Sequence, residues 1–184
     1  MSTVENLYAT SWELRTSITI DAPTDRVYGM VSDITRMGEW SPECVGGTWI
    51  AGTPGAVGAR FHGFNSEGPA VWSSECEVLT AEEPRTFGFS VLRFTKGRPS
   101  EDSEWVGGLK PGDVTWTFHL EETPTGCVLT QVHSMGYVNP FFQEILEEAD
   151  ESERAARVQA RKEHLQHSME STLQQVKVAA EKQG

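Results

Sequence analysis

The chain has 184 residues, a length that fits one domain, and its six Trp and eight Phe supply large apolar side chains that each bury roughly 150–250 Å². Hydrophobic residues make up 38% of the chain and charged residues 23%. The formal charge of −12 disfavours nucleic acid and anionic membrane surfaces as partners, because both need a basic surface on the protein.

The first elements are a strand and a helix. Residues 12–20 alternate between apolar and polar side chains, with Trp12 and Ile20 on the same face, which is typical of a half-buried strand. After a turn, residues 24–31 carry apolar side chains at helical spacing and predict an amphipathic helix. Residues 1–11 precede both elements, and we expect them to form a flexible N-terminus.

The next segment, SDITRMGEWSPEC, places a large apolar side chain in a loop. A short helical stretch ends at Gly38, and Trp40 stands two residues before Pro42, which restricts the backbone that precedes it. Two interpretations of Trp40 stay open: its indole forms a wall at the mouth of a cavity, or it anchors the loop to the core.

Six strand candidates follow, separated by glycines and prolines. Most of them alternate, so that one face of each is apolar. The last two are joined by the turn residues 124–126, which predict a hairpin. The candidates are residues 44–52, 57–65, 70–80, 82–92, 113–123 and 127–135.

Residues 93–113 are rich in glycine, proline and charge, and predict a long loop. Loops of this length are usually functional or disordered. Trp105 and Val106 lie in the middle of this polar segment. They either fold back onto the protein or belong to a mobile surface excursion.

Residues 140–182 predict a C-terminal helix. Asn139 can cap it, and Pro140 suits the first helical position. A straight helix of about 40 residues would be roughly 60 Å long, which exceeds a small domain, so we expect a break in the acidic segment 149–154. The extended helix also offers a surface on which a homodimer could form.

Consecutive strands followed by one long helix predict an α+β fold with an antiparallel sheet covered on one face. Where a strongly curved sheet wraps a helix, side chains need not fill the space between them. An apolar pocket with a few polar groups then results.

The order of these elements and the residues within them resemble the START-like superfamily, also called SRPBCC. This superfamily includes birch-pollen-allergen-like proteins, lipid-transfer START domains and polyketide cyclases. The resemblance covers roughly residues 12–180 and is strongest to the bacterial polyketide cyclase/dehydrase type. It is carried by ITIDAPTDRVYGMVSDITRMGEWSPE, GARFHGFN, WSSECEVLTAEEPRTFGFSV, VTWTFHLEETPTGCVLTQ and the terminal helix.

The resemblance implies one START-like domain over residues 1–184 with a helix-grip fold. In this fold, a curved antiparallel sheet of about six or seven strands wraps around the long C-terminal helix, and short helices follow the first strand. The cavity between sheet and helix binds hydrophobic ligands in this family. The expected lining comprises Trp40, Trp72, Ser74, Cys76, Phe87, Phe89, Trp116, Phe118, Leu165 and Met169.

Catalytic chemistry is weakly indicated. In the family register, Gln131 and His133 face the cavity, where an imidazole could act as an acid or base near neutral pH or could simply be a satisfied polar contact. His164 and His167 are three residues apart on a charged helix without a third ligand, so we expect a solvated helix face and no metal site.

The sequence shows no motif for a metal-binding cysteine cluster or a nucleotide cofactor. The three cysteines have no CxxC or Cys/His spacing and are expected to be buried, reduced thiols. No strand–GxGxxG–helix unit is present, so no nucleotide cofactor is expected. The N-terminal segment lacks the basic and apolar regions of a secretory signal, and no apolar run is long enough to span a bilayer, which indicates a cytoplasmic protein.

Three functions remain. The favoured hypothesis is a binding protein that carries a lipid, a polyketide or an aromatic metabolite, because the apolar lining follows from alternation whereas no catalytic set does. The alternative is a cyclase or aromatase that uses Gln131 or His133 without a metal or nucleotide cofactor. A weaker alternative is a protein-interaction module that uses the long helix.

Overall fold

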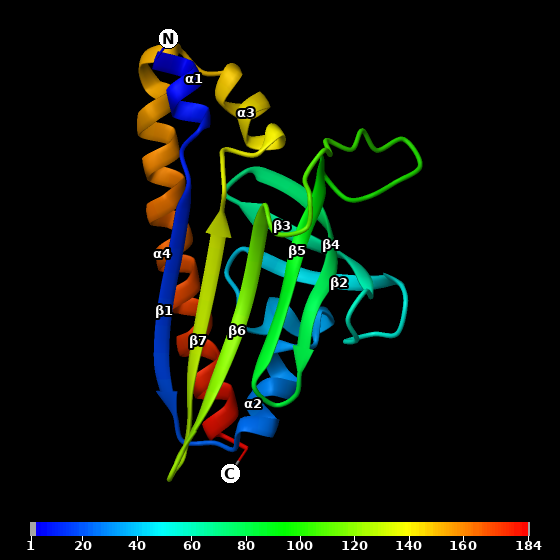
Figure 1. The fold of residues 1–184 in the computed structure, drawn as a ribbon, viewed down its shortest axis with the longest axis vertical. Helices are drawn as coiled ribbons and strands as arrows, with labels where there is room; N and C mark the ends of the chain where they lie inside the picture. The colour runs from blue at the N-terminus through cyan, green and yellow to red at the C-terminus, as the bar shows by residue number, and fades with distance from the viewer. Residues whose placement is uncertain (1–2, 184) are drawn as a thin grey trace.

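The computed structural model describes residues 3–183, and the side chains from residue 6 onward. Seven strands and five helical segments follow one another along the chain (Figure 1). The strands are β1 (Trp12–Ile20), β2 (Cys44–Ala51), β3 (Arg60–Glu67), β4 (Ala70–Glu82), β5 (Thr86–Lys96), β6 (Val114–Thr123) and β7 (Gly126–Met135). The helices are α1 (Thr3–Tyr8), α2 (Thr24–Val31), the 3-10 helix η1 (Ile34–Glu39), α3 (Pro140–Glu147) and α4 (Glu151–Glu181).

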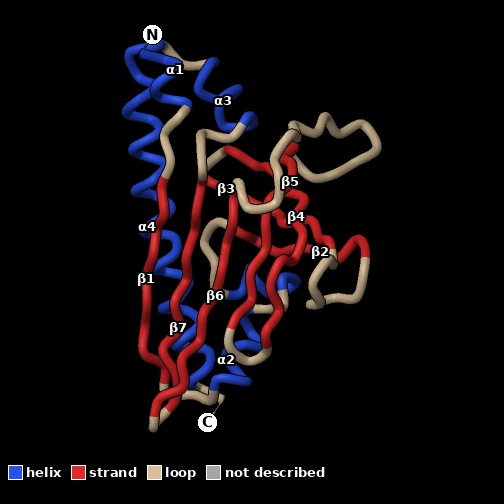
Figure 2. Tube along the Cα trace, viewed as in Figure 1, coloured by secondary structure: helices blue, strands red, loops and turns tan. Residues whose placement is uncertain are grey.

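The strands form one antiparallel sheet in the order β1-β7-β6-β5-β4-β3-β2. The α4 helix contacts β1 and β7. At the other edge of the sheet, β2 and β3 run behind β5 and β6 and across their direction in the view of Figures 1 and 2. Register shifts in β2 and β4 mark β-bulges, which bend a strand and increase its twist. The expected α+β helix-grip fold, with short helices after the first strand, is confirmed.

The C-terminal region forms two helices. The Asn139 side chain accepts a hydrogen bond from the Phe142 N–H at 3.0 Å and so caps α3, which begins with Pro140. The first helix ends at Glu147 and α4 runs from Glu151 to Glu181, so the break overlaps the start of the acidic segment 149–154 where it was expected. The apolar stripe of α4 faces the sheet and includes Val158, Leu165, Met169, Leu173 and Val176, all of them buried.

The N-terminal residues differ from the expected flexible segment. Thr3–Tyr8 form α1, and the Val138 N–H donates a hydrogen bond to the Tyr8 carbonyl at 3.0 Å. Leu7 and Tyr8 pack against the core. The sequence pattern missed this element because six residues are too few to show helical periodicity. Residues 1 and 2, which belong to the same expectation, lie outside the described residues.

The long loop is shorter than expected, because residues 93–96 belong to β5. Phe94 and Val106 exchange two backbone hydrogen bonds, of 2.9 and 2.7 Å, which pair the loop with β5. The Trp105 ring stacks on His62 with ring centroids 5.1 Å apart, and the Arg93 guanidinium lies 4.6 Å from the Trp105 ring centre. The apolar pair therefore folds back onto the sheet.

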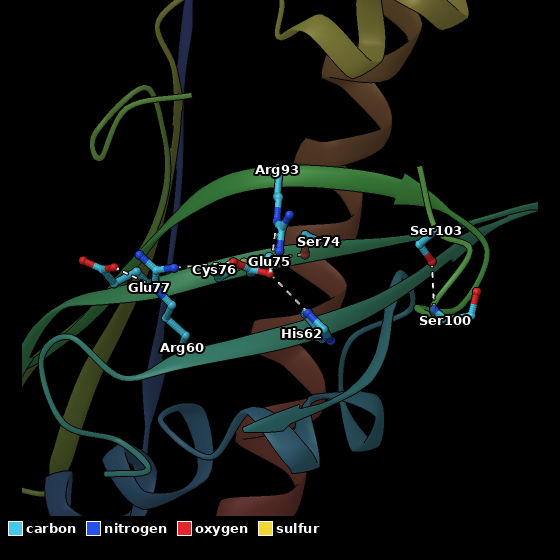
Figure 3. A network of polar contacts seen from close by, with 9 residues as sticks. All are labelled: Arg60, His62, Ser74, Glu75, Cys76, Glu77, Arg93, Ser100 and Ser103. Atoms are coloured by element: carbon cyan, nitrogen blue, oxygen red, sulfur yellow. Dashed lines mark hydrogen bonds and ion pairs between the residues drawn. The ribbon is translucent and has the colours of Figure 1, made fainter. Parts of the chain in front are cut away.

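The Trp105 side chain packs beside a polar network on the face of the sheet opposite α4. Figure 3 shows this network. Glu75 is only 5% exposed and accepts hydrogen bonds from Arg93 at 2.6 and 3.1 Å, with His62 at 3.4 Å. Burial alone would raise the pKa of Glu75, but the hydrogen bonds from Arg93 and His62 outweigh it and hold that pKa below its usual value. Arg60 points to this outer face and pairs with Glu77.

Candidate ligand-binding cavity

A cavity of about 290 Å³ lies between the sheet and α4. Small side chains on both walls leave this space open. Gly63 and Ser74 are paired on neighbouring strands, and a Cβ atom at Gly63 would lie 3.0 Å from the Ser74 Oγ. Ser168 and Thr172, one turn apart, line the opposite wall on α4. The volume is close to the lower limit of ordinary small-molecule pockets, about 300 Å³.

Aromatic rings form much of the remaining wall. The Phe61 and Phe89 rings meet edge to face with centroids 5.0 Å apart. The Trp116 indole stacks on the His133 ring at a centroid distance of 4.0 Å and an interplanar angle of 20°. All four side chains line the cavity, so an enclosed molecule meets flat, largely apolar surfaces.

The structure brings together seven of the ten side chains expected in the lining. They come from β4, β5, β6 and α4, and alternation along the strands places them on the concave face. These residues are Trp72, Ser74, Phe89, Trp116, Phe118, Leu165 and Met169.

Trp40, Phe87 and Cys76 do not line the cavity, which corrects their expected positions. The Trp40 indole is buried in the core at the end of η1 and has the Arg36 guanidinium 5.0 Å from its ring centre, so it anchors the loop. The Phe87 ring meets the Tyr28 ring edge to face at 6.4 Å, where α2 closes the end of the sheet.

Cys76 lies two residues further along β4 than Ser74, opposite the bulky Phe61 instead of Gly63. Its thiol donates to the Ser74 Oγ at 3.5 Å, and burial raises its pKa to about 12. Burial likewise raises the pKa of Cys44, which lines the cavity, to about 11. Both thiols are protonated at neutral pH and are poor nucleophiles.

Several lining residues were not anticipated. Trp12 reaches the cavity from the start of β1, and Phe94 comes from the β5 extension that was assigned to the loop. Phe141 stacks on Phe94 with centroids 5.3 Å apart, and Phe142 lies next to it on α3. The consecutive pair of phenylalanines after Pro140 was a signal in the sequence, but only the packing of α3 against β5 directs it to the cavity.

One region of the lining is polar. Gln131 and His133 are both buried and lie two residues apart on β7, so their side chains share the concave face. The His133 Nδ1 lies 3.0 Å from the Thr115 carbonyl oxygen and therefore carries the proton in the neutral ring. Burial lowers the pKa of His133 to about 3, so the imidazole is neutral at physiological pH.

Charged residues connect α4 to the sheet at another part of the lining. The Arg161 guanidinium donates to both carboxylate oxygens of Glu43 and to Glu67, the latter at 2.7 Å. It also lies 5.4 Å from the Trp72 ring centre. Glu43 directly precedes β2, Glu67 ends β3 and Arg161 is on α4, so one guanidinium joins three distant parts of the chain.

The same region holds a group of potential metal ligands. Ligand atoms of Glu43, Glu67 and His164 lie within 4.8 Å of one another. The sequence did not indicate this group, because the carboxylates are about 100 residues from the histidine. Since the Arg161 guanidinium already bonds to both carboxylates, the residues form an ion-pair network, and a cation would have to displace Arg161.

Residues 11–170 match the family described as "Polyketide cyclase / dehydrase and lipid transport". The chain belongs to this family. Among curated proteins no match was found.

Solved structures of this family and of related folds are similar to the chain. The Polyketide_cyc-like protein Cgl2372 from Corynebacterium glutamicum is 30% identical, with a TM-score of 0.53 over 92% of this chain and 94% of that one. Major latex-like protein 151 from Panax ginseng shares the fold at 14% identity, with a TM-score of 0.59 over 92% of this chain and 97% of that one.

A two-domain protein also shares this fold. StfQ, a di-domain ARO/CYC from the steffimycin biosynthetic pathway, has a TM-score of 0.66 at 14% identity. The alignment covers 97% of this polyketide cyclase/dehydrase-family chain and 54% of StfQ. Within the described residues, no helix of this family member is both long and apolar enough to cross a membrane.

Proposed function

We propose that the protein binds a small hydrophobic molecule in the cavity between the sheet and α4. The observation that carries this proposal is the cavity itself, whose walls are mostly aromatic and aliphatic side chains. Removing apolar surface from water supplies about 25 cal/mol per Å² of binding free energy. Membership of a family described by polyketide cyclisation, dehydration and lipid transport supports the same ligand classes: a lipid, a polyketide or an aromatic metabolite.

Binding is favoured over cyclase activity. StfQ is described as an ARO/CYC protein, but it shares only 14% identity with this chain. A general acid or base works best when its pKa lies near the working pH. His133 is neutral with a pKa of about 3, and Gln131 does not titrate, so neither residue is suited to moving protons at neutral pH.

The proposal is tested with 1-aminoanthracene, a neutral fluorescent probe whose emission rises in apolar surroundings. We expect saturable binding to the parent protein and about tenfold weaker binding to Phe89→Ala. That factor corresponds to the loss of roughly 50 Å² of apolar contact at about 25 cal/mol per Å². The measurement is a fluorescence titration at constant protein concentration.

Phe64→Ala is the matched control. Phe64 lies on β3 outside the cavity lining, under the Arg98 guanidinium, which is 4.0 Å from its ring centre. This variant should bind the probe as the parent does. No saturable binding by the parent, or equal weakening in both variants, would remove the support for a ligand in this cavity.

A further inference from the structure

Two buried polar groups of the cavity lining lack hydrogen-bond partners. Gln131 is 5% exposed, and its Oε1 accepts no hydrogen bond from any residue that the structure describes. The Trp12 Nε1–H is also buried and donates to no group within residues 3–183. An unpaired buried polar group costs free energy, so a native cavity that keeps two of them needs an explanation.

His133 adds a further acceptor. Its Nδ1–H donates to the Thr115 carbonyl, which leaves the Nε2 of the neutral ring with a free lone pair. The centroids of the His133 and Trp12 rings are 6.3 Å apart, and Gln131 is two residues from His133 on the same face of β7. The polar subsite Trp12–Gln131–His133 thus offers two acceptors, the Gln131 Oε1 and the His133 Nε2, and donors from the Trp12 N–H and the Gln131 amide.

We infer that this subsite takes the hydroxyl group of a neutral ring compound, such as a phenol. A hydroxyl group donates one hydrogen bond and accepts others, so it can give its proton to Gln131 or His133 and accept from the Trp12 N–H. An ether or ketone oxygen accepts only and leaves both acceptors unpaired. The inference rests on the proposed function, because it names the class of molecule that the cavity holds.

The charges of the lining disfavour an anionic ligand. Arg161 is the cationic side chain among the lining residues, and it is already bonded to Glu43 and Glu67. With His133 neutral, two carboxylates and one guanidinium leave a formal charge of −1 on the lining at pH 7. A fatty acid or another carboxylate would enter without a free cation to receive it, and its desolvation would be uncompensated.

The size and shape of the cavity favour fused rings. An apolar cavity of about 150 Å³ accommodates benzene, and this one has about 290 Å³. The stacked Trp116 and His133 rings present a flat wall beside the subsite. A planar molecule of two or three rings therefore places its face on these rings and its hydroxyl group at Gln131.

The test compares three two-ring probes by calorimetric titration of the parent protein at pH 7. These are 2-naphthol, 2-methoxynaphthalene, which keeps the oxygen but has no O–H donor, and 2-naphthoate, which carries a negative charge. We expect 2-naphthol to bind about tenfold more tightly than 2-methoxynaphthalene, which is the effect of one hydrogen bond to an otherwise unpaired buried group. The carboxylate should bind most weakly.

A substitution of Gln131 tests whether the polar subsite causes the preference for 2-naphthol over 2-methoxynaphthalene. Gln131→Leu keeps a side chain of similar bulk and removes its polar atoms, so the affinities for 2-naphthol and 2-methoxynaphthalene should approach each other. Thr130→Val is the matched control on the opposite face of β7, where the Thr130 Oγ1 bonds to the Ser17 Oγ at 2.7 Å. It should keep the preference of the parent.

The outcomes separate the two proposals. Equal binding of 2-naphthol and 2-methoxynaphthalene by the parent, or tightest binding of 2-naphthoate, overturns the hydroxyl subsite and leaves the cavity function standing. A preference that persists in Gln131→Leu overturns the role of Gln131 in the subsite. If none of these probes binds, and 1-aminoanthracene does not bind either, the proposed function itself fails.

Discussion

His133 shows how burial changes the chemistry of a side chain. In water an imidazole titrates near pH 6.5 and can exchange protons at neutral pH. Here it is 4% exposed, stacked on Trp116 and hydrogen-bonded through Nδ1, so that burial disfavours the charged form and its pKa falls to about 3. The residue is therefore better described as a fixed hydrogen-bond acceptor than as an acid.

This pKa predicts how stability depends on pH. Below about pH 6.5 the unfolded chain protonates His133, whereas the folded protein does not until about pH 3, so the unfolded state binds more protons in this window. The free energy of unfolding should therefore fall as the pH is lowered from 6.5 toward 3, with His133 contributing up to about 1.4 kcal/mol per pH unit.

Urea unfolding of the parent and of His133→Asn between pH 7 and pH 5 measures this contribution. The variant keeps a side-chain donor for the Thr115 carbonyl and should show the shallower pH dependence. His119→Asn, an exposed substitution on β6, should keep the slope of the parent. Equal slopes in the parent and in His133→Asn would mean that His133 is not held neutral by the fold.

The position of α4 depends on more than its apolar stripe. Leu165 and Met169 pack toward the sheet, but small residues one helical turn apart leave the cavity open beside them. Where packing is interrupted in this way, the Arg161 network ties the helix to the residue before β2 and to the end of β3. The polar contact thus holds two layers together at a place where side chains do not fill the space.

Arg161→Met should lower the free energy of unfolding by about 2 kcal/mol. Removing one partner of a fully buried ion pair costs roughly 3–5 kcal/mol. The expected loss is smaller because the Glu67 side chain is 39% exposed and water can solvate it, whereas that of Glu43 is only 10% exposed. Urea denaturation at pH 7 gives the value.

Arg157→Met is the matched control, one turn earlier on α4. The Arg157 side chain is 51% exposed and contacts only the exposed Glu153, at 3.4 Å, among the charged groups described. Exposed pairs of this kind contribute about 0–1 kcal/mol. Losses of similar size in both variants would show that the Arg161 network does not fasten the helix.

The cavity belongs to the whole molecule, because its walls come from strands of the entire sheet and from helices near both ends of the fold. A ligand bound there contacts both layers and is lost when they separate. Binding to the folded state alone stabilises it by about 2.7 kcal/mol when the free ligand is at 100 times its Kd.

Saturating 1-aminoanthracene should therefore raise the midpoint of thermal unfolding by about 5–10 °C, since 1 kcal/mol shifts Tm by about 2–4 °C in a chain of this size. Differential scanning calorimetry measures the shift. In Ser168→Phe the new ring fills the cavity, and the shift should largely disappear. A similar shift in this variant would place the probe elsewhere on the protein.

Local patterns in the sequence were sufficient to predict an antiparallel sheet covered by a long helix, and the family resemblance implied the helix-grip arrangement. Alternation in residues 12–20 and 70–80 identified strands and their apolar faces, and Asn139 with Pro140 marked the start of a helix. These signals depend on the chain's own neighbours, so they can be read without a structure. The same alternation placed Trp72, Phe89 and Trp116 on the face that lines the cavity.

The tertiary structure decided how far the cavity extends and which polar groups face it. Phe87 and Phe89 share one apolar face in the sequence, yet α2 seals the first and leaves the second at the cavity. Glu43, Glu67 and Arg161 meet only because three distant elements converge. Periodicity reports which face of an element is buried, whereas the partner that buries it is set by contacts between residues far apart in the chain.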